Sequence, residues 1–253
     1  MLHSNIHISA SIVLFNQDEN TLQKTINAIL KCNEIERLFL IDNSKINNGL
    51  KYQDVDKIEY RFTKANLGFG SAHNLIINEI NNTFTHHLVL NPDVVFNPKD
   101  ILVLVSELEN YDEVAMISPK AMYPTGEMQY TCRKNPTFLE LIYRRLHINK
   151  KFVYFQEYRD KDLTVPFCPA FVHGFFMLFK TEDFVRVNGF DERYFLYMED
   201  ADICRKIYKN NKKVLYFPGV EVIHEHQKGS TKKIRLLFHH FSSAMKYFKK
   251  WKN

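Results

Sequence analysis

Apolar residues in the first half of the chain recur with two alternating periods. Short apolar runs, typical of buried strands, alternate with segments in which apolar residues recur every three or four positions, as on one face of a helix. The strands are predicted at 11–15, 37–41, 58–62, 87–90 and 114–118. The helices are predicted within 22–30, 72–80 and 101–108. This alternation indicates right-handed βαβ units and a mostly parallel sheet, so the predicted fold class is α/β.

The second half of the chain has a less regular pattern. Residues 124–170 are rich in proline, tyrosine and basic residues. Helices are predicted at 139–146, from an N-cap at Thr181 to Asn188-Gly189, and at 199–208, and strands at 175–179, 214–217 and 220–223. Pro218-Gly219 separates the last two strands. Because no segment resembles a linker, we expect a single domain over residues 1–231.

Polar residues follow three of the predicted strands. Asn16, Asp42 and Asp93 each stand where an apolar run stops. In open α/β sheets, ligands bind outside the carboxyl ends of the strands. The three side chains are therefore expected to converge on one edge of the sheet, where a nucleotide would bind.

Composition and charge restrict the class of protein. The 253 residues include no basic region followed by a long apolar run at the start and no stretch near the length of a membrane span. The four cysteines form no C-x-x-C pair, which favours reduced thiols and a cytoplasmic protein. The net charge of +5 comes from the tail, because eight basic and no acidic residues lie between Lys228 and Asn253. A uniformly basic nucleic-acid-binding protein is therefore disfavoured.

The tail at 232–253 is predicted to be a basic amphipathic helix. Its apolar residues fall at helical spacing: Ile234, Leu237, Phe238, Phe241, Met245, Phe248 and Trp251. Such a helix can lie in a membrane interface with its basic residues facing anionic lipid, or it can pack on its own domain. Both are possible together, with Phe248 and Trp251 as the exposed end.

Two positions could bind a metal ion. Asp93 ends the sequence Leu90-Asn91-Pro92-Asp93, and a carboxylate at a strand end can hold a divalent cation that bridges the phosphates of a nucleotide sugar. The same sequence is also ordinary turn chemistry. His224, on the same strand face as His226, is either a metal ligand or a surface residue.

A cluster of carboxylates, Glu199-Asp200-Ala201-Asp202, follows the aromatic run at 194–197. Acidic residues at a helix start are favoured by the helix dipole, which supplies a purely structural interpretation. The aromatic run indicates instead a partly buried wall with acidic groups at its rim. Burial there would raise the pKa of a carboxyl group and make it a better general base.

Two nucleotide-binding signatures are incomplete. Gly68-Phe69-Gly70 lacks the third glycine of a dinucleotide fingerprint and follows the third strand, which argues against a Rossmann dehydrogenase. A nucleotidyltransferase would need a glycine-rich loop with lysine or arginine after the first strand. The residues there read LFNQD (14–18).

Eight short motifs, in order along nearly the whole chain, resemble those of the bacterial family 2 glycosyltransferases with the GT-A fold, and within them the rhamnosyltransferase-like group. The motifs are SIVLFN (11–16), IDNS (41–44), NLGFGSAHN (66–74), LNPD (90–93), HGFF (173–176), GFDE (189–192), EDAD (199–202) and VIH (222–224). The resemblance implies that residues 1–123 bind the nucleotide sugar and that residues 124–231 bind the acceptor.

The resemblance also implies roles for residues on the nucleotide side. Phe15 and Asn16 would cradle the nucleotide, and Asp42 would read its base. The matched motifs add four residues to the implied nucleotide- or substrate-binding set: Asn66, Gly68, Asn74 and Glu199.

Further roles are implied for the metal and the acceptor. Asn91 and Asp93 stand at the two ends of the family's D-x-D motif. Because Asn replaces the first acidic residue here, Asp93 would be the main metal ligand and His224 the second. Asp200 would be the general base, with Gly174 as the small residue beside the acceptor.

The implied activity is metal-dependent transfer, with inversion, of a hexosyl-type sugar from a nucleotide diphosphate to a hydroxyl group. The implied cofactor is Mg²⁺ or Mn²⁺, and the subgroup suggests dTDP-L-rhamnose as donor. The acceptor would be a glycan or lipid-linked glycan of bacterial surface polysaccharide synthesis, which would place the protein in the cytoplasm or on the inner face of the membrane. Two alternatives remain: a nucleotidyltransferase of similar fold, and a non-catalytic module that binds a membrane surface.

Overall fold

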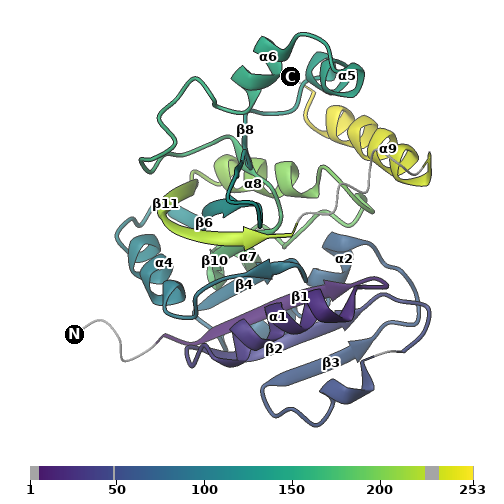
Figure 1. Cartoon of the computed structure of the whole chain (residues 1–253), viewed down its shortest axis with the longest axis vertical. Helices are drawn as coiled ribbons and strands as arrows, with labels where there is room; N and C mark the ends of the chain where they lie inside the picture. The colour runs from purple at the N-terminus through teal and green to yellow at the C-terminus, as the bar shows by residue number, and fades with distance from the viewer. Residues whose placement is uncertain (1–5, 48, 226–233, 253) are drawn as a thin grey trace.

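The computed structural model describes residues 6–47, 49–225 and 234–252. These residues fold into a mixed central sheet flanked by helices, which confirms the α/β fold class (Figure 1). The strand order is β3-β2-β1-β4-β10-β6-β11-β5, with β7 paired to β6. The predicted positions of His226 and of tail residues Lys228, Lys232 and Lys233 lie outside the described residues.

The strands and helices have the following bounds. The strands are β1 (Ile8–Leu14), β2 (Ile35–Asp42), β3 (Ile58–Phe62), β4 (His86–Leu90), β5 (Val94–Val95), β6 (Val114–Met122), β7 (Met128–Gln129), β8 (Cys132–Arg133), β9 (Phe171–Val172), β10 (Phe176–Lys180) and β11 (Lys213–His224). The helices are α1 (Glu19–Leu30), η1 (Leu50–Tyr52), α2 (Phe69–Asn74), α3 (Ile77–Ile80), α4 (Asp100–Glu109), α5 (Phe138–Leu146), α6 (Lys150–Gln156), α7 (Thr181–Arg186), α8 (Glu199–Lys209) and α9 (Ile234–Lys250).

The first four strands form the parallel part of the sheet. Leu14 of β1 lies opposite Asp42 of β2, and Ile12 of β1 lies opposite Leu90 of β4. The carboxyl ends of these strands therefore meet at one edge, as the polar residues after them predict. Four residues separate the end of β1 from the start of helix α1. The carboxylate of Asp18 caps the first turn of α1 by accepting a hydrogen bond of 2.9 Å from the N–H of Thr21.

The second half of the chain adds strands of both directions to this sheet, since β7 and β10 are antiparallel to their neighbours whereas β11 is parallel to β6 and antiparallel to β5. Strand β10 inserts between β4 and β6 and is antiparallel to both. The prediction of two strands around Pro218-Gly219 was wrong, because β11 runs unbroken from Lys213 to His224. Its register against β6 shifts between Phe217 and Glu221, so the Pro-Gly pair makes an irregularity in the strand and does not end it.

Two helix predictions also change. The helix predicted within 72–80 is divided into α2 and α3, and Leu75 between them is 44% exposed. Thr181 is the first residue of α7, and Lys180 takes the N-cap position. Asn188 and Gly189 after this helix both have positive φ, which agrees with the predicted end.

A chain of buried serine and histidine side chains crosses the parallel part of the sheet. His87 bonds Ser9 through Nδ1 (2.8 Å) and Ser11 through Nε2 (2.9 Å). Ser11 Oγ also lies 2.7 Å from Nδ1 of His73. All four residues are buried, and burial lowers the pKa of His87 to about 3 and that of His73 well below its usual value.

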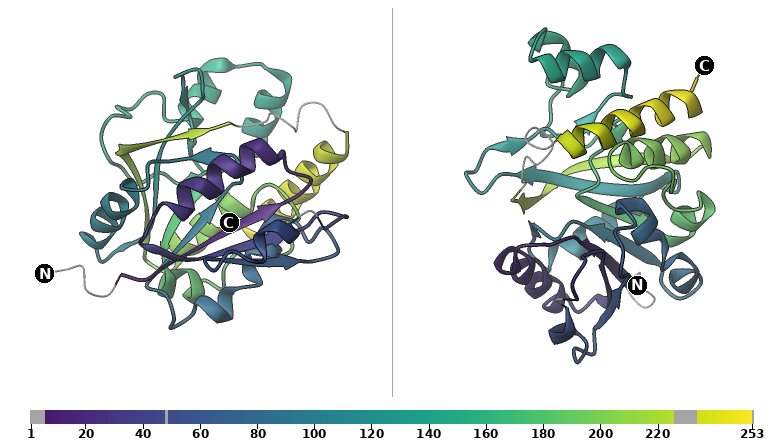
Figure 2. Two further views of the ribbon diagram at one scale, coloured as in Figure 1. Left: turned by 60° about the horizontal axis from the view of Figure 1, so that its bottom comes forward. Right: turned by 90° about the vertical axis from the view of Figure 1, so that its right-hand side faces the viewer.

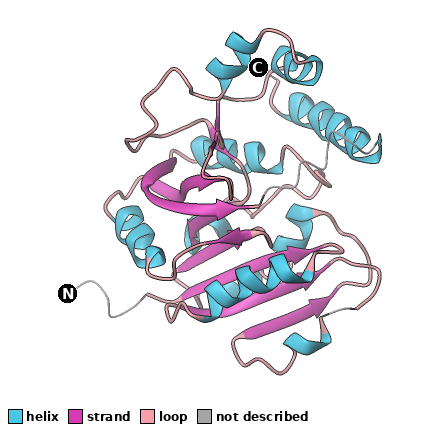
Figure 3. Ribbon diagram, viewed as in Figure 1, coloured by secondary structure: helices cyan, strands magenta, loops and turns pink. Residues whose placement is uncertain are grey.

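Helices α5, α6 and α9 lie at the end of the molecule opposite β3 (Figures 1 and 2). The segment that leads from β6 to β10 is mostly loop, with short strands and the helices α5 and α6 (Figure 3). Helix α9 lies between this segment and α8 (Figure 2). Among the described residues, no helix is both long and apolar enough to cross a membrane.

Candidate functional site

Asp42 lies in a pocket at the carboxyl ends of β1 and β2. The pocket has a volume of about 270 Å³, and Leu14, Ser44, Lys51 and Tyr52 contribute to its lining. The buried Asp42 carboxylate accepts hydrogen bonds of 2.8 Å from the N–H of Ser44 and 2.8 Å from the hydroxyl of Tyr60. The structure thus places Asp42 at the predicted nucleotide edge, already oriented by protein donors.

The end of β1 brings two further predicted residues to this edge. Phe15 is 48% exposed, so part of its aromatic side chain is accessible to a ligand. Asn16 adopts a left-handed conformation with φ of 50°, and its N–H donates a 2.9 Å hydrogen bond to Ser44 Oγ. The turn after β1 is therefore held against the turn after β2.

The motif at 66–74 makes contacts that bind the two halves of the chain together. Gly68 has φ of +88°, and a Cβ atom there would lie 2.3 Å from the carbonyl oxygen of Phe195. Its N–H donates to the side chain of Asn66 (3.0 Å). The side-chain amide of Asn74 holds the backbone of Phe190: its nitrogen donates to the carbonyl oxygen at 2.8 Å and its oxygen accepts from the N–H at 2.9 Å. These contacts account for the three residues structurally, and their nucleotide-binding role stays a prediction.

Asp93 and His224 are brought together by sheet pairing. Val94 of β5 lies opposite His224 of β11, which places Asp93 at the end of β11. The distance from Nε2 of His224 to Oδ1 of Asp93 is 3.4 Å, and Asn91 Nδ2 lies 3.5 Å from the same nitrogen. The two predicted metal ligands thus meet, and Asn91, predicted to bind the nucleotide or substrate, lies beside them.

The orientation of His224 depends on Gln129, which the sequence analysis missed, and on Phe175, which it placed in a motif without a role of its own. Gln129 of β7 receives the Nδ1 hydrogen of His224 at 2.9 Å and donates its own amide to the carbonyl oxygen of His224 at 2.7 Å. The ring of Phe175 stacks on the imidazole at 5.1 Å. With Nδ1 committed to Gln129, Nε2 is directed toward Asp93, the arrangement typical of a metal-ligating histidine.

The pair has the chemistry that a divalent cation requires. Asp93 Oδ1 is buried and accepts no hydrogen bond within the described part of the chain. A buried carboxylate oxygen without a donor is costly unless a cation approaches it. The described residues hold no cluster of three or more His, Cys, Asp and Glu side chains suited to a metal. Two protein ligands suit an ion whose other positions are taken by substrate phosphates and water.

Each carboxylate of the acidic cluster has a different environment. Asp200 is partly exposed in a second pocket, of about 200 Å³, and accepts hydrogen bonds from the N–H of Ala201 (2.8 Å) and of Gly174. Burial raises the pKa of Asp200 to about 6. Glu199 is buried, and burial together with the charge of Asp200 raises its pKa well above the usual range.

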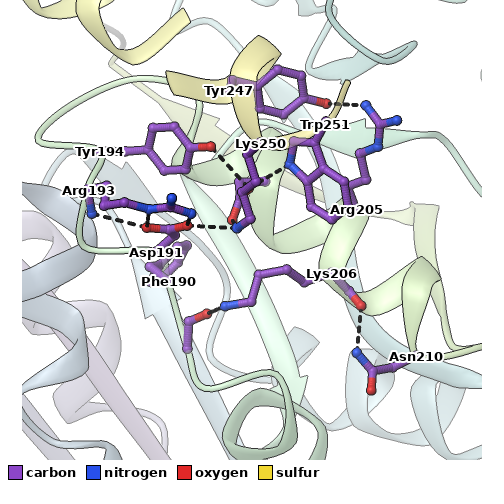
Figure 4. Close-up of polar contacts among 12 residues, drawn as sticks. Phe190, Asp191, Arg193, Tyr194, Arg205, Lys206, Asn210, Tyr247, Lys250 and Trp251 are labelled. Atoms are coloured by element: carbon purple, nitrogen blue, oxygen red, sulfur yellow. Dashed lines mark hydrogen bonds and ion pairs between the residues drawn. The ribbon is translucent and has the colours of Figure 1, made fainter. Parts of the chain in front are cut away.

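Asp202 has a structural role in the contact with α9. Its Oδ2 lies 2.7 Å from Nζ of Lys250. Lys250 also contacts Asp191 at 2.7 Å (Figure 4). The indole N–H of Trp251 donates to Oδ1 of Asp202 at 2.7 Å. The structural interpretation of the acidic cluster therefore holds for Asp202. Glu199 and Asp200 both line the pocket and both have a raised pKa, but Glu199 is buried and Asp200 is partly exposed.

One short segment connects the candidate base to the candidate metal ligands. Gly174 hydrogen-bonds Asp200, and the next residue, Phe175, stacks on His224. The carbonyl oxygen of Phe175 also accepts a 2.9 Å hydrogen bond from the N–H of Asn91. A Cβ atom on Gly174 would lie 3.6 Å from the Cβ of Asp200 and 3.5 Å from the ring of Phe69, so a side chain larger than a methyl group would press on these neighbours.

A buried arginine, also absent from the sequence prediction, lines the pocket of Asp200. Arg133 forms an ion pair of 2.5 Å with Glu157, and its Nε donates to His173 at 3.2 Å. Burial lowers the pKa of Arg133 to about 9. The spacing of 124–170 contains no periodic signal that would have identified this pair.

The sequence is similar to those of known glycosyltransferases. Residues 9–183 match the family described as glycosyl transferase family 2, and residues 167–239 match the N-terminal domain of galactosyltransferase. Rhamnosyltransferase WbbL of Escherichia coli is 30% identical over 62% of this chain and 60% of its own length. N-acetylglucosaminyl-diphospho-decaprenol L-rhamnosyltransferase of Mycobacterium tuberculosis is 29% identical over 72% of this chain and 64% of its own length. The chain spans less than two thirds of either relative.

Solved structures share the fold at low sequence identity. GalNAc-T7, determined with UDP, GalNAc and Mn²⁺, superposes with a TM-score of 0.69 and 16% identity over 89% of this chain and 44% of that one. The mannosyltransferase PcManGT of Pyrobaculum calidifontis, in complex with GDP-Man and Mn²⁺, has a TM-score of 0.61 and 14% identity over 96% of this chain and 65% of that one. These likenesses establish the GT-A fold.

Proposed function

The chain belongs to glycosyl transferase family 2, since that family matches residues 9–183, and we propose that it transfers a sugar from a nucleotide diphosphate to an acceptor hydroxyl with inversion. The observation that carries the proposal is the position of Gly174 and Phe175, which hold Asp200 on one side and His224 on the other. Two consecutive residues thus connect the proposed proton acceptor to the proposed diphosphate-binding pair, which supports the proposal.

The names of the relatives support a donor and an acceptor. Both are rhamnosyltransferases, and the mycobacterial name specifies an L-rhamnosyl group and an N-acetylglucosaminyl-diphospho-decaprenol acceptor. We therefore propose dTDP-L-rhamnose as the donor and a lipid-linked glycan of surface polysaccharide synthesis as the acceptor. A peripheral position on the inner face of the cytoplasmic membrane follows from such an acceptor.

The nucleotide edge binds the donor in this proposal. Asp42 accepts N–H groups of the base, and the exposed ring of Phe15 packs beside it. Asp93 and His224 hold a divalent cation, Mg²⁺ or Mn²⁺, which supplies charge neutralisation at the leaving diphosphate. Gln129 keeps His224 in the orientation and tautomer that this binding requires.

The pocket of Asp200 binds the acceptor. Asp200 removes the proton of the acceptor hydroxyl as oxygen attacks the anomeric carbon, and it is largely ionised at pH 7 because its pKa is about 6. Attack on the face opposite the leaving diphosphate inverts the anomeric centre. No covalent intermediate on the protein is needed.

The two alternative functions receive less support. Family membership favours glycosyl transfer over nucleotidyl transfer. A non-catalytic membrane module would give no reason for the contact of Asp93 with His224 or for the access of Asp200 to a pocket.

The test is a transfer assay with a panel of nucleotide sugars that includes dTDP-L-rhamnose, UDP-N-acetylglucosamine and GDP-mannose. The acceptor is a polyprenyl-diphosphate-linked N-acetylglucosamine, supplied with Mg²⁺ or Mn²⁺ and, separately, with EDTA. We expect transfer with metal, loss of transfer with EDTA, and weaker metal-dependent binding of dTDP in Asp93→Ala and His224→Ala. Asp100→Asn, at the start of α4, is the matched control and should behave as wild type.

Three outcomes would count against the proposal. A folded protein that transfers no sugar from any donor in the panel would contradict glycosyl transfer. Full activity in a metal-free preparation would contradict the role of Asp93 and His224. Transfer from another donor and not from dTDP-L-rhamnose would contradict the proposed donor but not glycosyl transfer itself.

A further inference from the structure

Helices α5 and α9 expose apolar side chains next to one another. We call this surface the apolar face, and it consists of Phe138, Leu139, Ile142 and Leu146 of α5 with Leu237, Phe238, Phe241 and Met245 of α9. Their exposed fractions range from 37% to 69%. Scattered exposed apolar residues are ordinary, but eight on two adjacent helices form a patch that calls for a partner.

The structure shows which side of α9 packs on the protein. Ser243, Ala244 and Tyr247 are buried, and Lys250 and Trp251 contact Asp202. Phe248 and Trp251 are partly buried against the core, so the prediction that they form the exposed end was wrong. The exposed apolar residues of α9 lie nearer its N-terminus, from Leu237 to Met245. Helix α9 therefore packs on the domain through one face and leaves a second apolar face open.

The two helices that carry the apolar face contact each other. The rings of Phe138 in α5 and Phe248 in α9 meet edge to face with centroids 6.0 Å apart. Both helices also line the pocket of Asp200, α5 through Leu141 and Arg144 and α9 through His240. The apolar face thus adjoins the pocket that contains the candidate base.

The charges around the apolar face have one sign. Glu140 is the one acidic residue within 138–156 and 234–252, and it is buried and paired with Arg144 at 2.6 Å. Among the side chains of these segments whose burial the structure describes, the exposed charged ones are Arg145, Lys150, Lys151, Lys246, Lys249 and Lys252. Apolar helix faces flanked by basic residues are complementary to an anionic lipid surface, whereas lysine is depleted at interfaces between proteins.

We propose that the apolar face inserts into the interfacial region of an anionic bilayer, with α5 and α9 lying on the membrane together. The apolar side chains enter the boundary between headgroups and acyl chains, while the surrounding lysines contact lipid phosphates. The pocket of Asp200 then opens at the membrane surface. This docking does not depend on which sugar is transferred, because it involves neither the nucleotide edge nor the metal-binding pair.

The test is flotation of the full chain with vesicles of phosphatidylglycerol and phosphatidylcholine in equal parts, and with phosphatidylcholine alone. Wild type should float with the anionic vesicles, less at high salt, and weakly with neutral ones. The fourfold variant Leu139→Ser, Leu146→Ser, Phe238→Ser and Phe241→Ser should partition at least about tenfold less, because these side chains supply much of the inserted apolar area. Deleting the tail is a poorer test, since Tyr247 and Trp251 pack against the core.

Two further variants separate the causes. Lys246→Glu with Lys249→Glu keeps the apolar residues and should remove the preference for anionic vesicles. Val103→Ser with Lys99→Glu is the matched control, because it alters one exposed apolar and one exposed basic residue at α4 and should float as wild type. All variants are compared by circular dichroism to confirm that they are folded.

Several outcomes would overturn the proposal. Equal flotation of wild type and a folded fourfold variant would exclude the apolar face as the lipid contact. A wild type that does not float but forms a dimer, with the fourfold variant monomeric by light scattering, would assign the face to a second copy of the chain. Because these measurements do not use sugar transfer, a failure of the proposed enzymatic function would leave their result unaffected.

Discussion

Replacing Asp200 by Asn tests the assignment of the general base. Asn has nearly the same shape and its oxygen can keep the hydrogen bonds from Ala201 and Gly174, but it cannot accept a proton. General-base catalysis contributes about 10²–10⁴-fold to rate. We therefore expect kcat of Asp200→Asn to fall by about that factor, with the affinity for dTDP unchanged because the nucleotide edge is untouched.

The pKa of Asp200 sets the pH dependence of the wild-type reaction. The base works when ionised, so activity should be present above the folded pKa of about 6 and should be lost as the pH falls through it. At pH 5 about one tenth of the protein would carry an ionised Asp200, whereas a carboxyl group of ordinary pKa would be almost fully ionised. We expect kcat/KM to drop about tenfold per pH unit below pH 6.

The same pKa shift predicts an opposite effect on stability. Because the folded pKa of Asp200 is raised from 3.8 to about 6, the ionised group costs the folded state as much as about 3 kcal/mol at neutral pH. Asp200→Asn should therefore raise the midpoint of thermal unfolding while it lowers turnover. The matched control is Asp202→Asn on the same helix, which weakens the contact with Lys250 and should lower stability with little effect on turnover of folded enzyme.

The assays are initial rates between pH 5 and pH 8 and thermal unfolding at pH 7. A folded Asp200→Asn variant with wild-type turnover would refute the reasoning. So would a wild-type profile that is flat between pH 5 and pH 7 when transfer, and not product release, limits the rate.

Two further predictions concern residues outside the acidic cluster. Gln129→Ala should weaken Mn²⁺-dependent dTDP binding about 10- to 100-fold, measured by calorimetry, because His224 loses its orienting partner; unchanged affinity would show that Gln129 does not position it. Stability should fall as the pH drops below about 6.5, because His73 and His87 are buried with lowered pKa values and take up protons only on unfolding. The free energy of unfolding is measured by urea titration at several pH values. In a folded His87→Gln variant, its slope against pH should be smaller by about 1.4 kcal/mol per pH unit; an unchanged slope would contradict this account.

The local pattern of the sequence was enough to place most of the sheet. Strand β3 has the predicted bounds, and β1, β2, β4 and β6 differ from prediction mainly at their ends. Buried strands and amphipathic helices carry their periodicity in consecutive residues, so no distant contact is needed to recognise them. Once the strands were located, the polar residues after them predicted the sheet edge where Asp42 and Asp93 lie, because the ends of parallel strands meet at one edge.

The sequence by itself also identified the residue types of the candidate site. Asp93, Asp200 and His224 were selected by motif, and the structure places Asp93 and His224 in contact and Asp200 in a pocket. Their chemical roles remain predictions for the assays above. The sequence could not select Gln129, because it lies 95 residues from His224 and no local pattern connects the two.

Tertiary structure alone decided how neighbouring residues of one helix divide their roles. The motif EDAD contains three carboxylates that the sequence treats alike. Packing buries Glu199, pairs Asp202 with Lys250 across 48 residues, and leaves Asp200 facing a pocket. The division follows from the helical turn, which sends Glu199 and Asp202, three positions apart, to one side of α8.

The orientation of α9 was likewise decided by distant partners. Apolar residues cover so much of this helix that its sequence predicts an amphipathic element but not which apolar residues are buried. Asp191 and Asp202 receive Lys250, and Tyr247 enters the core, so the face with Phe238 and Phe241 remains exposed. Periodicity is a property of the helix alone, whereas the face that docks depends on what the rest of the fold presents to it.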